Sequence, residues 1–144
     1  MAISFHPRVG QILLCDFCPG FKEPEMIKTA RPVVVLAGHL PGRGGLITVV
    51  ACSTQKPEIV RPYHYQIPST SMPPIPRFNE KDTWVKGDMV YTVGFHRLNL
   101  IFTGKDPNGK RMYFSQCLGK EQINEIRRCV LHGMGMSFIA NQIK

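Results

Sequence analysis

Chemically distinct side chains stand at the ends of apolar runs, where a strand would present them at the edge of a sheet. Arg31 directly precedes the run PVVVL and Ser53 directly follows the run ITVVAC. Lys86 and Asp88 stand at the start of a third run, MVYTV. A guanidinium offers planar donors to a phosphate, a hydroxyl adds a small donor, and a carboxylate can move a proton. These residue types predict phosphodiester chemistry, provided that the fold brings them to one patch.

The apolar runs that flank these residues predict β-strands. Each run is short, rich in Val, Ile, Thr, Tyr and Phe, and bounded by Gly or Pro. The predicted strands are QILLCDF at 11–17, PVVVLAG at 32–38, GLITVVAC at 45–52, YHYQI at 63–67, DMVYTVGF at 88–95 and NLIFTG at 99–104. The turn sequence DPNG at 106–109, followed by RMYFSQ, predicts a further hairpin.

The meeting of Arg31 and Ser53 depends on how the second and third strands pair. If they are antiparallel neighbours joined by the glycine-rich connector at 38–45, the start of one strand lies beside the end of the other, and Arg31 lies near Ser53. The alternative is an ordinary surface arginine and a Ser-Thr turn. The connector predicts a hairpin loop rather than a phosphate cradle, because no GK[ST] sequence and no helix follow it.

From Lys120 the apolar residues change to helical spacing. Ile123, Ile126, Val130 and Leu131 fall on one face of a helix, and the period resumes weakly toward the C-terminus. With the strands, this helix predicts a mainly β (α+β) fold. We expect a small closed or nearly closed β-sheet with an amphipathic helix at its C-terminal end.

One segment, PSTSMPPIPRFNEKDT at 68–83, contains four prolines and follows neither the strand period nor the helix period. It predicts an irregular loop, longer than compact domains usually need, and such loops are often functional. It could gate a groove, contact a partner or cover an edge strand, and the sequence does not choose among these roles.

Length and composition limit the classes of protein to which the chain can belong. With 144 residues and a formal net charge of +8, it predicts one domain, residues 1–144, that needs no disulfide or metal to hold it together. No apolar run approaches the roughly 20 residues of a membrane span, and the N-terminus shows no export signal, so we expect a cytoplasmic protein with no membrane partner. The positive charge favours polyanionic partners such as nucleic acids.

The cysteines and histidines predict neither a metal site nor a catalytic triad. The five cysteines are an odd number without the spacing of a disulfide framework, which is typical of a reducing compartment. Cys15 and Cys18 form a CxxC pair, but no second pair stands at the spacing of a structural zinc site. Cys52 closes an apolar strand and has no base near it in sequence, so core packing is its expected role rather than nucleophilic attack.

The order of these features resembles the PemK/MazF toxins of bacterial type II toxin–antitoxin systems. The matching segments are VGQILLCDF at 9–17, Glu25, RPVVVL at 31–36, the triplet Ser53, Thr54 and Gln55, the segment DMVYTV at 88–93, Arg97, and the C-terminal helix from Lys120. The resemblance covers most of the chain and is interrupted at 68–83 and at 99–116. Three positions depart from the family: Ser53 stands where members usually have Thr, Met89 stands in place of Gln, and Lys86 stands where some members have Arg. Glu25 lies one residue further from Arg31 than the usual Glu of the family.

The resemblance implies an SH3-like small barrel of the PemK type, a homodimer, and metal-independent, sequence-specific cleavage of single-stranded RNA without a cofactor. It assigns catalytic roles to Arg31, Ser53 and Asp88. It assigns RNA-binding or accessory roles to Glu25, Thr54, Gln55, Lys86 and Arg97. Lys86 occupies a position that is Arg in some members, and this exchange loses bidentate phosphate contact. The implied protein partner is an antitoxin with an acidic, disordered tail that covers the basic groove.

The expected mechanism is attack of a ribose 2′-OH on the adjacent phosphorus, which explains a preference for RNA over DNA. Arg31 would stabilise charge on the phosphorane-like oxygens, Ser53 would donate a hydrogen bond, and Asp88 or Glu25 would act as base or contact a nucleotide. Two alternatives remain open. One is a protein of the same fold that poisons DNA gyrase by contact, although this chain ends in NQIK without the Trp-Gly-Ile character expected for that role. The other is a degenerate toxin that binds antitoxin without cutting RNA.

Overall fold

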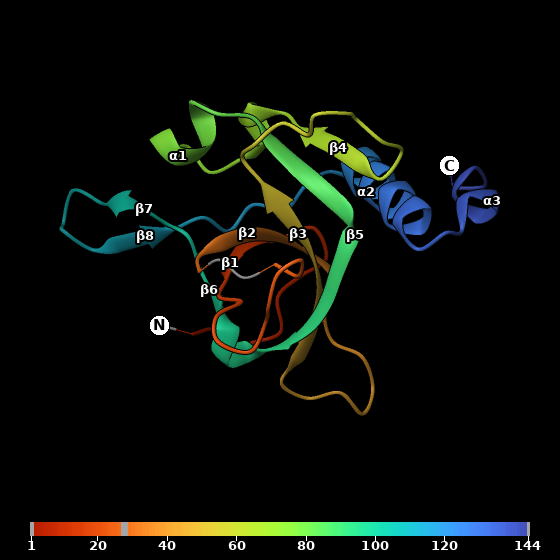
Figure 1. Ribbon diagram of the computed structural model, residues 1–144. Coiled ribbons are helices and arrows are strands. Elements are labelled where there is room, and N and C mark those ends of the chain that lie inside the picture. Colours follow the sequence, from red (N-terminus) through yellow and green to blue (C-terminus); the bar gives the residue numbers. More distant parts are fainter. Residues whose placement is uncertain (1, 27–28, 144) are drawn as a thin grey trace.

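Six antiparallel strands form one curled sheet in the computed structural model, which describes residues 2–26 and 29–143 (Figure 1). The strands are β1 (Ile12–Cys15), β2 (Arg31–Ala37), β3 (Leu46–Ser53), β4 (His64–Ile67), β5 (Thr83–Gly94) and β6 (Leu98–Asn99). They are hydrogen-bonded in the order β4-β5-β3-β2-β1-β6. The mainly β class is therefore confirmed. In the described ranges, no ladder joins β4 to β6, so backbone hydrogen bonds do not close the sheet into a barrel.

The β2–β3 pair has the antiparallel arrangement that the sequence predicts. Val33 lies opposite Ala51, and the 38–45 connector is the hairpin loop between the two strands. Side chains alternate between the two faces of a strand. Arg31 and Ser53, each two residues beyond this pair, therefore share the face of Val33 and Ala51 at the end of the sheet.

The two faces of the sheet bury two separate clusters of apolar residues. One cluster, around Leu13, Val33 and Ala51, lies on the face that Arg31 and Ser53 share. The other contains Val34 and Val50, with side chains from the helices and from segment 68–83 packed onto them. Strand β2 contains four consecutive buried residues. They are all buried because an apolar cluster covers each face of the strand.

Strand β5 is longer than predicted and starts earlier. The expected strand at 88–95 begins instead at Thr83, so Lys86 and Asp88 lie inside β5 rather than at its start. Between the pairs Val50–Val90 and Cys52–Val85, residues 86–89 of β5 stand opposite Ala51 alone. Such a bulge re-aims side chains out of the regular pleat.

Segment 68–83 is not the irregular loop that its composition predicts. It contains a short 3-10 helix, η1 (Ser69–Ser71), a single-turn helix, α1 (Pro76–Asn79), and the first residue of β5. Met72 and Phe78 are both buried in the second core cluster. The burial of these two residues could not be predicted from the sequence, because neither of them belongs to a strand or helix period of apolar residues.

The predicted strand at 99–104 is also divided. Its first residue belongs to β6, which pairs with β1, while Phe102–Lys105 forms β7 and pairs with β8 (Arg111–Tyr113) in a separate two-stranded sheet. The DPNG turn closes this hairpin, as predicted, and the Asp106 carboxylate accepts hydrogen bonds from the backbone N–H groups of Asn108 and Lys110. The hairpin extends away from the curled sheet on the side opposite the C-terminal helices (Figure 1).

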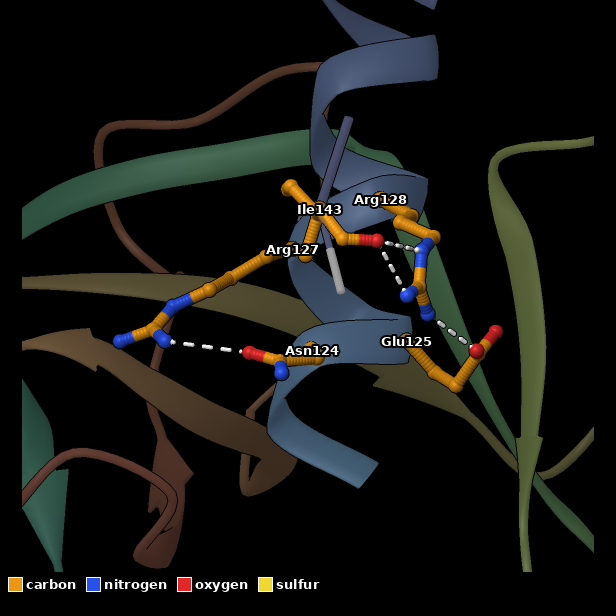
Figure 2. A network of polar contacts seen from close by, with 5 residues as sticks. All are labelled: Asn124, Glu125, Arg127, Arg128 and Ile143. Atoms are coloured by element: carbon orange, nitrogen blue, oxygen red, sulfur yellow. Dashed lines mark hydrogen bonds and ion pairs between the residues drawn. The ribbon is translucent and has the colours of Figure 1, made fainter. Parts of the chain in front are cut away.

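Two helices, rather than one, end the chain: α2 (Lys120–Gly133) and the short α3 (Ser137–Ala140). Ile126 of α2 is buried and Ile123 and Val130 pack beside it, as the helical period predicts. The Arg128 guanidinium donates hydrogen bonds to the Ile143 carbonyl and to Glu125, which holds the end of the chain against α2 (Figure 2). None of the helices in the described ranges is long and apolar enough to cross a membrane.

Candidate active site

Arg31 and Ser53 line one cavity of about 400 Å³ at the end of β2 and β3. We call it the arginine cavity; its lining residues are Glu23, Pro24, Glu25, Met26, Arg31, Ser53, Gln55, Lys86 and Met89. The two groups come from adjacent antiparallel strands, which hold their backbones in fixed register. The structure therefore brings Arg31 and Ser53 to one cavity, as the strand pairing predicts.

Ser53 is a rigidly held hydroxyl. Its side chain lies on β3 opposite Trp84 and the residue is only 5% exposed. Its Oγ accepts a hydrogen bond of 3.1 Å from the backbone N–H of Gln55. Because this contact uses a lone pair, the hydroxyl hydrogen is left to serve as a donor toward the cavity.

Arg31 is a partly buried cation without an acidic partner. Within residues 2–26 and 29–143, its side chain forms no ion pair, and its buried Nε has no hydrogen-bond partner. Burial of the guanidinium lowers the pKa of Arg31, and the nearby charge of Arg77 lowers it further. Both effects disfavour the charged form, so an anion that enters the cavity gains an unused donor and relieves the destabilisation.

A second cavity, of about 460 Å³, adjoins the first and shares Ser53, Gln55 and Lys86 with it. We call it the histidine cavity; its other lining residues are Lys56, Pro57, Glu58, Ile59, Arg61, Tyr63, His64 and Asp88. Asp88 therefore does not line the arginine cavity. The carboxylates that do are Glu23 and Glu25.

The β5 bulge presents Lys86 and Asp88, and helix α2 supports it from behind. The Gly87 N–H donates a 2.7 Å hydrogen bond to the Tyr63 carbonyl. A Cβ atom at Gly87 would meet the Cys129 carbonyl oxygen at 2.4 Å, and one at Gly133 would meet the Gly87 oxygen at 2.4 Å. The backbones of α2 and the bulge thus touch directly, which only glycine allows at these two positions.

His64 is a cavity residue that the sequence analysis did not select. It pairs across β4 and β5 with Lys86, and its Nδ1 accepts a 2.9 Å hydrogen bond from the Arg61 backbone N–H. Burial lowers the pKa of His64, the cations Lys86 and Arg61 add to this effect, and Asp88 opposes it. The neutral ring therefore carries its proton on Nε2 and acts as a hydrogen-bond donor. Only the pairing of β4 with β5 reveals this placement.

Glu25 lies in a loop that the fold fixes at several points. Its carboxylate accepts a 3.0 Å hydrogen bond from the Lys22 backbone N–H, while the Tyr91 hydroxyl accepts one of 3.1 Å from the Met26 N–H. Glu25 thus reaches the arginine cavity although it is exposed.

Two of the residues suggested for RNA binding lie outside both cavities. Thr54 is partly buried and lines neither of them. Arg97 donates hydrogen bonds of 2.9 and 3.0 Å to the carbonyls of Asp16 and Pro19, and its guanidinium stacks on Phe21 at 5.0 Å. The observed role of Arg97 is to anchor the loop that carries Glu25.

Cysteines line neither of the two cavities. Cys15 and Cys52 are fully buried in the core, and burial raises the pKa of each thiol to about 12. Cys52 is therefore a packing residue, as expected. Cys18 of the CxxC pair is exposed, and a search of the described ranges finds no group of three or more metal-ligating side chains.

Fold and site together define a small, mainly β protein that presents an arginine and a buried serine at one end of a curled antiparallel sheet. A family model described as the PemK-like, MazF-like toxin of type II toxin–antitoxin systems matches residues 8–132. The chain belongs to this family.

Other proteins are similar to this chain in sequence or in fold. YifN of Escherichia coli K12 is 31% identical over 98% of this chain and its own full length. An uncharacterized protein of Haemophilus influenzae is 28% identical over 99% of this chain and its full length. Among solved structures, MazF of Deinococcus radiodurans superposes with a TM-score of 0.62 at 15% identity, covering 92% of this chain and 100% of that one. A mycobacterial endoribonuclease in complex with its cognate antitoxin gives 0.56 at 18% identity, covering 90% and 96%.

Proposed function

We propose that this protein is a toxin that cuts single-stranded RNA at specific sequences without a metal ion. The observation that carries the proposal is the arginine cavity, where a partly buried, unpaired guanidinium and a fixed hydroxyl donor face the same space. This donor pair suits the oxygens of a phosphodiester as negative charge develops on them.

In the proposed reaction, the ribose 2′-oxygen attacks the adjacent phosphorus to form a 2′,3′-cyclic phosphate. The bond from phosphorus to the 5′-oxygen breaks, and this oxygen takes a proton from water and leaves as a 5′-hydroxyl. Arg31 and Ser53 donate hydrogen bonds to the non-bridging oxygens and stabilise the transition state. Glu25, the carboxylate in the arginine cavity that the family resemblance singles out, takes the 2′-hydroxyl proton. Lys86, which borders both cavities, holds a phosphate, and Asp88 with Gln55 contacts a nucleotide in the histidine cavity.

The proposed partners follow from the family. We propose a homodimer in solution, and an antitoxin whose acidic segment blocks the RNA-binding surface. The solved mycobacterial relative is an endoribonuclease bound to its cognate antitoxin, which supports a partner of this kind. Light scattering of the purified protein measures the oligomeric state directly.

The experiment that tests the proposal is digestion of a long RNA in EDTA, with fragment ends mapped by primer extension. The wild-type protein is expected to give discrete fragments with 5′-hydroxyl ends, and a 2′-deoxy nucleotide at the cut site should block cleavage there. Arg31→Ala should lower the rate by roughly 10²–10³ or more while its thermal melting stays close to wild type. Intact RNA with the wild-type protein would favour a degenerate toxin or a protein that acts by contact alone.

A further inference from the structure

A second arginine approaches Arg31 from segment 68–83, which contains none of the family motifs named above. Arg77 lies on α1, and its Nη2 donates a hydrogen bond to the carbonyl of Ala30, the residue directly before Arg31. The charge of Arg77 also acts on Arg31, whose pKa it lowers. The hydrogen bond to Ala30 places the Arg77 guanidinium at the end of β2 that begins with Arg31.

The support beneath Arg77 is rigid. Its neighbour Phe78 is fully buried in the second core cluster, and Pro76 stands at the start of the helical turn. The Arg77 guanidinium lies over the Phe78 ring, 5.1 Å from its centroid. The Ser71 hydroxyl accepts a 2.8 Å hydrogen bond from Gln122 of α2, which fixes the segment at a second point. Arg77 is thus held on the fold rather than carried on a free loop.

The backbone between the two arginines is strained. Ala30 has a φ of +52°, in the left-handed region that residues with a Cβ rarely adopt. Its carbonyl is the acceptor that Arg77 binds. The fold therefore maintains an unfavourable conformation directly before Arg31, and Arg77 takes part in maintaining it.

Two adjacent cations need an anion, and the described part of the chain does not supply one. The ion pair found there joins Arg128 to Glu125, and neither Arg31 nor Arg77 pairs with a carboxylate. Burial lowers the pKa of Arg77 as well. A phosphate bound beside both guanidiniums would accept charge-assisted hydrogen bonds from them and offset their mutual repulsion.

We propose that Arg77, which lies outside the lining of both cavities, is a further phosphate-binding residue next to this site, and that it binds one backbone phosphate of the RNA beside the phosphate held by Arg31. The inference rests on the proposed function, since it takes RNA as the ligand. An acidic peptide offers carboxylates instead. RNA is favoured because the phosphate held at Arg31 has neighbouring phosphates in the same strand, so a second cation at this end of β2 can bind one of them.

The test uses an RNA with the mapped cleavage sequence and a 2′-deoxy nucleotide at the cut site, so that it binds without being cut. Its dissociation constant is measured by fluorescence anisotropy over a series of salt concentrations. Arg77→Gln keeps a hydrogen-bond donor but removes the charge. It is expected to weaken binding about tenfold and to reduce the slope of log affinity against log salt by about 0.7. Arg77→Lys should keep the slope.

Arg8 offers a matched control. It is also an exposed arginine whose Nη2 donates to one backbone carbonyl, that of Ser115, at 2.8 Å. It lies before Gly10, which bonds to Val35 near the opposite end of β2, so Arg8→Gln should bind as the wild-type protein does. A wild-type slope for Arg77→Gln would overturn the inference, while failure of the wild-type protein to bind RNA would reject the proposed function itself.

A second measurement begins with the wild-type protein, so it also gives a result if Arg77→Gln does not fold. Single phosphates of the same RNA are replaced, one at a time, by neutral methylphosphonates. The wild-type protein should show a reduced salt slope for the scissile position, for a position that Lys86 holds, and for one further position nearby. In the Arg77→Gln protein, a methylphosphonate at that further position should cause no additional loss of affinity. A scan in which only the scissile phosphate and the position held by Lys86 matter would contradict a phosphate site at Arg77.

Discussion

At the scale of single residues, the departure from the family at Ser53 is the sharpest question. Serine keeps the hydroxyl of the usual threonine and loses the methyl group that restricts its χ1 rotamer. In this protein, a hydrogen bond from the Gln55 N–H and the neighbouring Trp84 restrain the side chain instead. The hydroxyl is therefore positioned by the strand end and the turn after it, and the missing methyl does not by itself imply an inactive site.

The first prediction follows from this positioning. Ser53→Ala removes the donor and should lower the cleavage rate by roughly 10²–10³, with little change in thermal melting because the buried site keeps an apolar Cβ. Ser53→Thr retains the hydroxyl and should cleave within a few-fold of wild type. Single-turnover kinetics on a mapped RNA measure both rates. Equal activity of Ser53→Ala and the wild-type protein would remove Ser53 from the catalytic set.

Some residues near the site could be predicted from the sequence and others could not, because different contacts determine their positions. Arg31 and Ser53 were predictable because antiparallel strands joined by a hairpin fix which ends meet. His64 and Arg77 were not, because their places depend on contacts between distant segments: β4 with β5, and α1 with Ala30. For Arg97 the sequence suggested a role that the structure does not support directly. Its place in the family motif suggested RNA binding, but its guanidinium donates hydrogen bonds to backbone carbonyls.

At the scale of elements, the site depends on the contact between α2 and the β5 bulge. The helix face was predictable from its apolar period, but the bulge was not, because residues 86–89 contain no proline and no unusual turn sequence. What marks the bulge is a glycine in the strand, Gly87, and a second glycine in the helix, Gly133, which meet backbone to backbone. A glycine inside a strand or a helix ordinarily destabilises that element.

The second prediction concerns this contact. In an open helix position, Gly→Ala stabilises by about 1 kcal/mol. At Gly133, the new Cβ would lie 2.4 Å from the Gly87 carbonyl oxygen, and overpacking of this kind costs roughly 1–3 kcal/mol. Gly133→Ala should therefore lower the melting temperature and also weaken RNA cleavage, because the bulge carries Lys86.

Gly44 provides the control for this prediction. A Cβ atom added there would meet no other atom within 4 Å, and the backbone of Gly44 lies outside the left-handed region, so Gly44→Ala should leave melting and cleavage unchanged. Thermal denaturation and cleavage rates for the two variants make the comparison. A Gly133→Ala protein more stable than wild type would show that the helix does not press on the bulge.

At the scale of the whole molecule, the charge is spread rather than concentrated in the cavities. The chain carries a formal net charge of +8, yet the arginine cavity contains Glu23 and Glu25 beside Arg31 and Lys86. Long-range attraction of RNA or of an acidic partner therefore arises from the total charge, which acts within the screening length of the solution. Orientation within the site depends on the few residues that contact the phosphates.

This separation of roles leads to the last prediction. An acidic peptide, such as oligoglutamate, should inhibit RNA cleavage by competing for the same positive surface, whereas an oligoglutamine of equal length should not. Inhibition should raise KM without changing kcat and should weaken as salt increases, because both polyanions are attracted through a screened field. Initial rates at several peptide and salt concentrations measure these effects. A fall in kcat at constant KM would mean that the peptide binds elsewhere and that the acidic partner does not act by covering the RNA site.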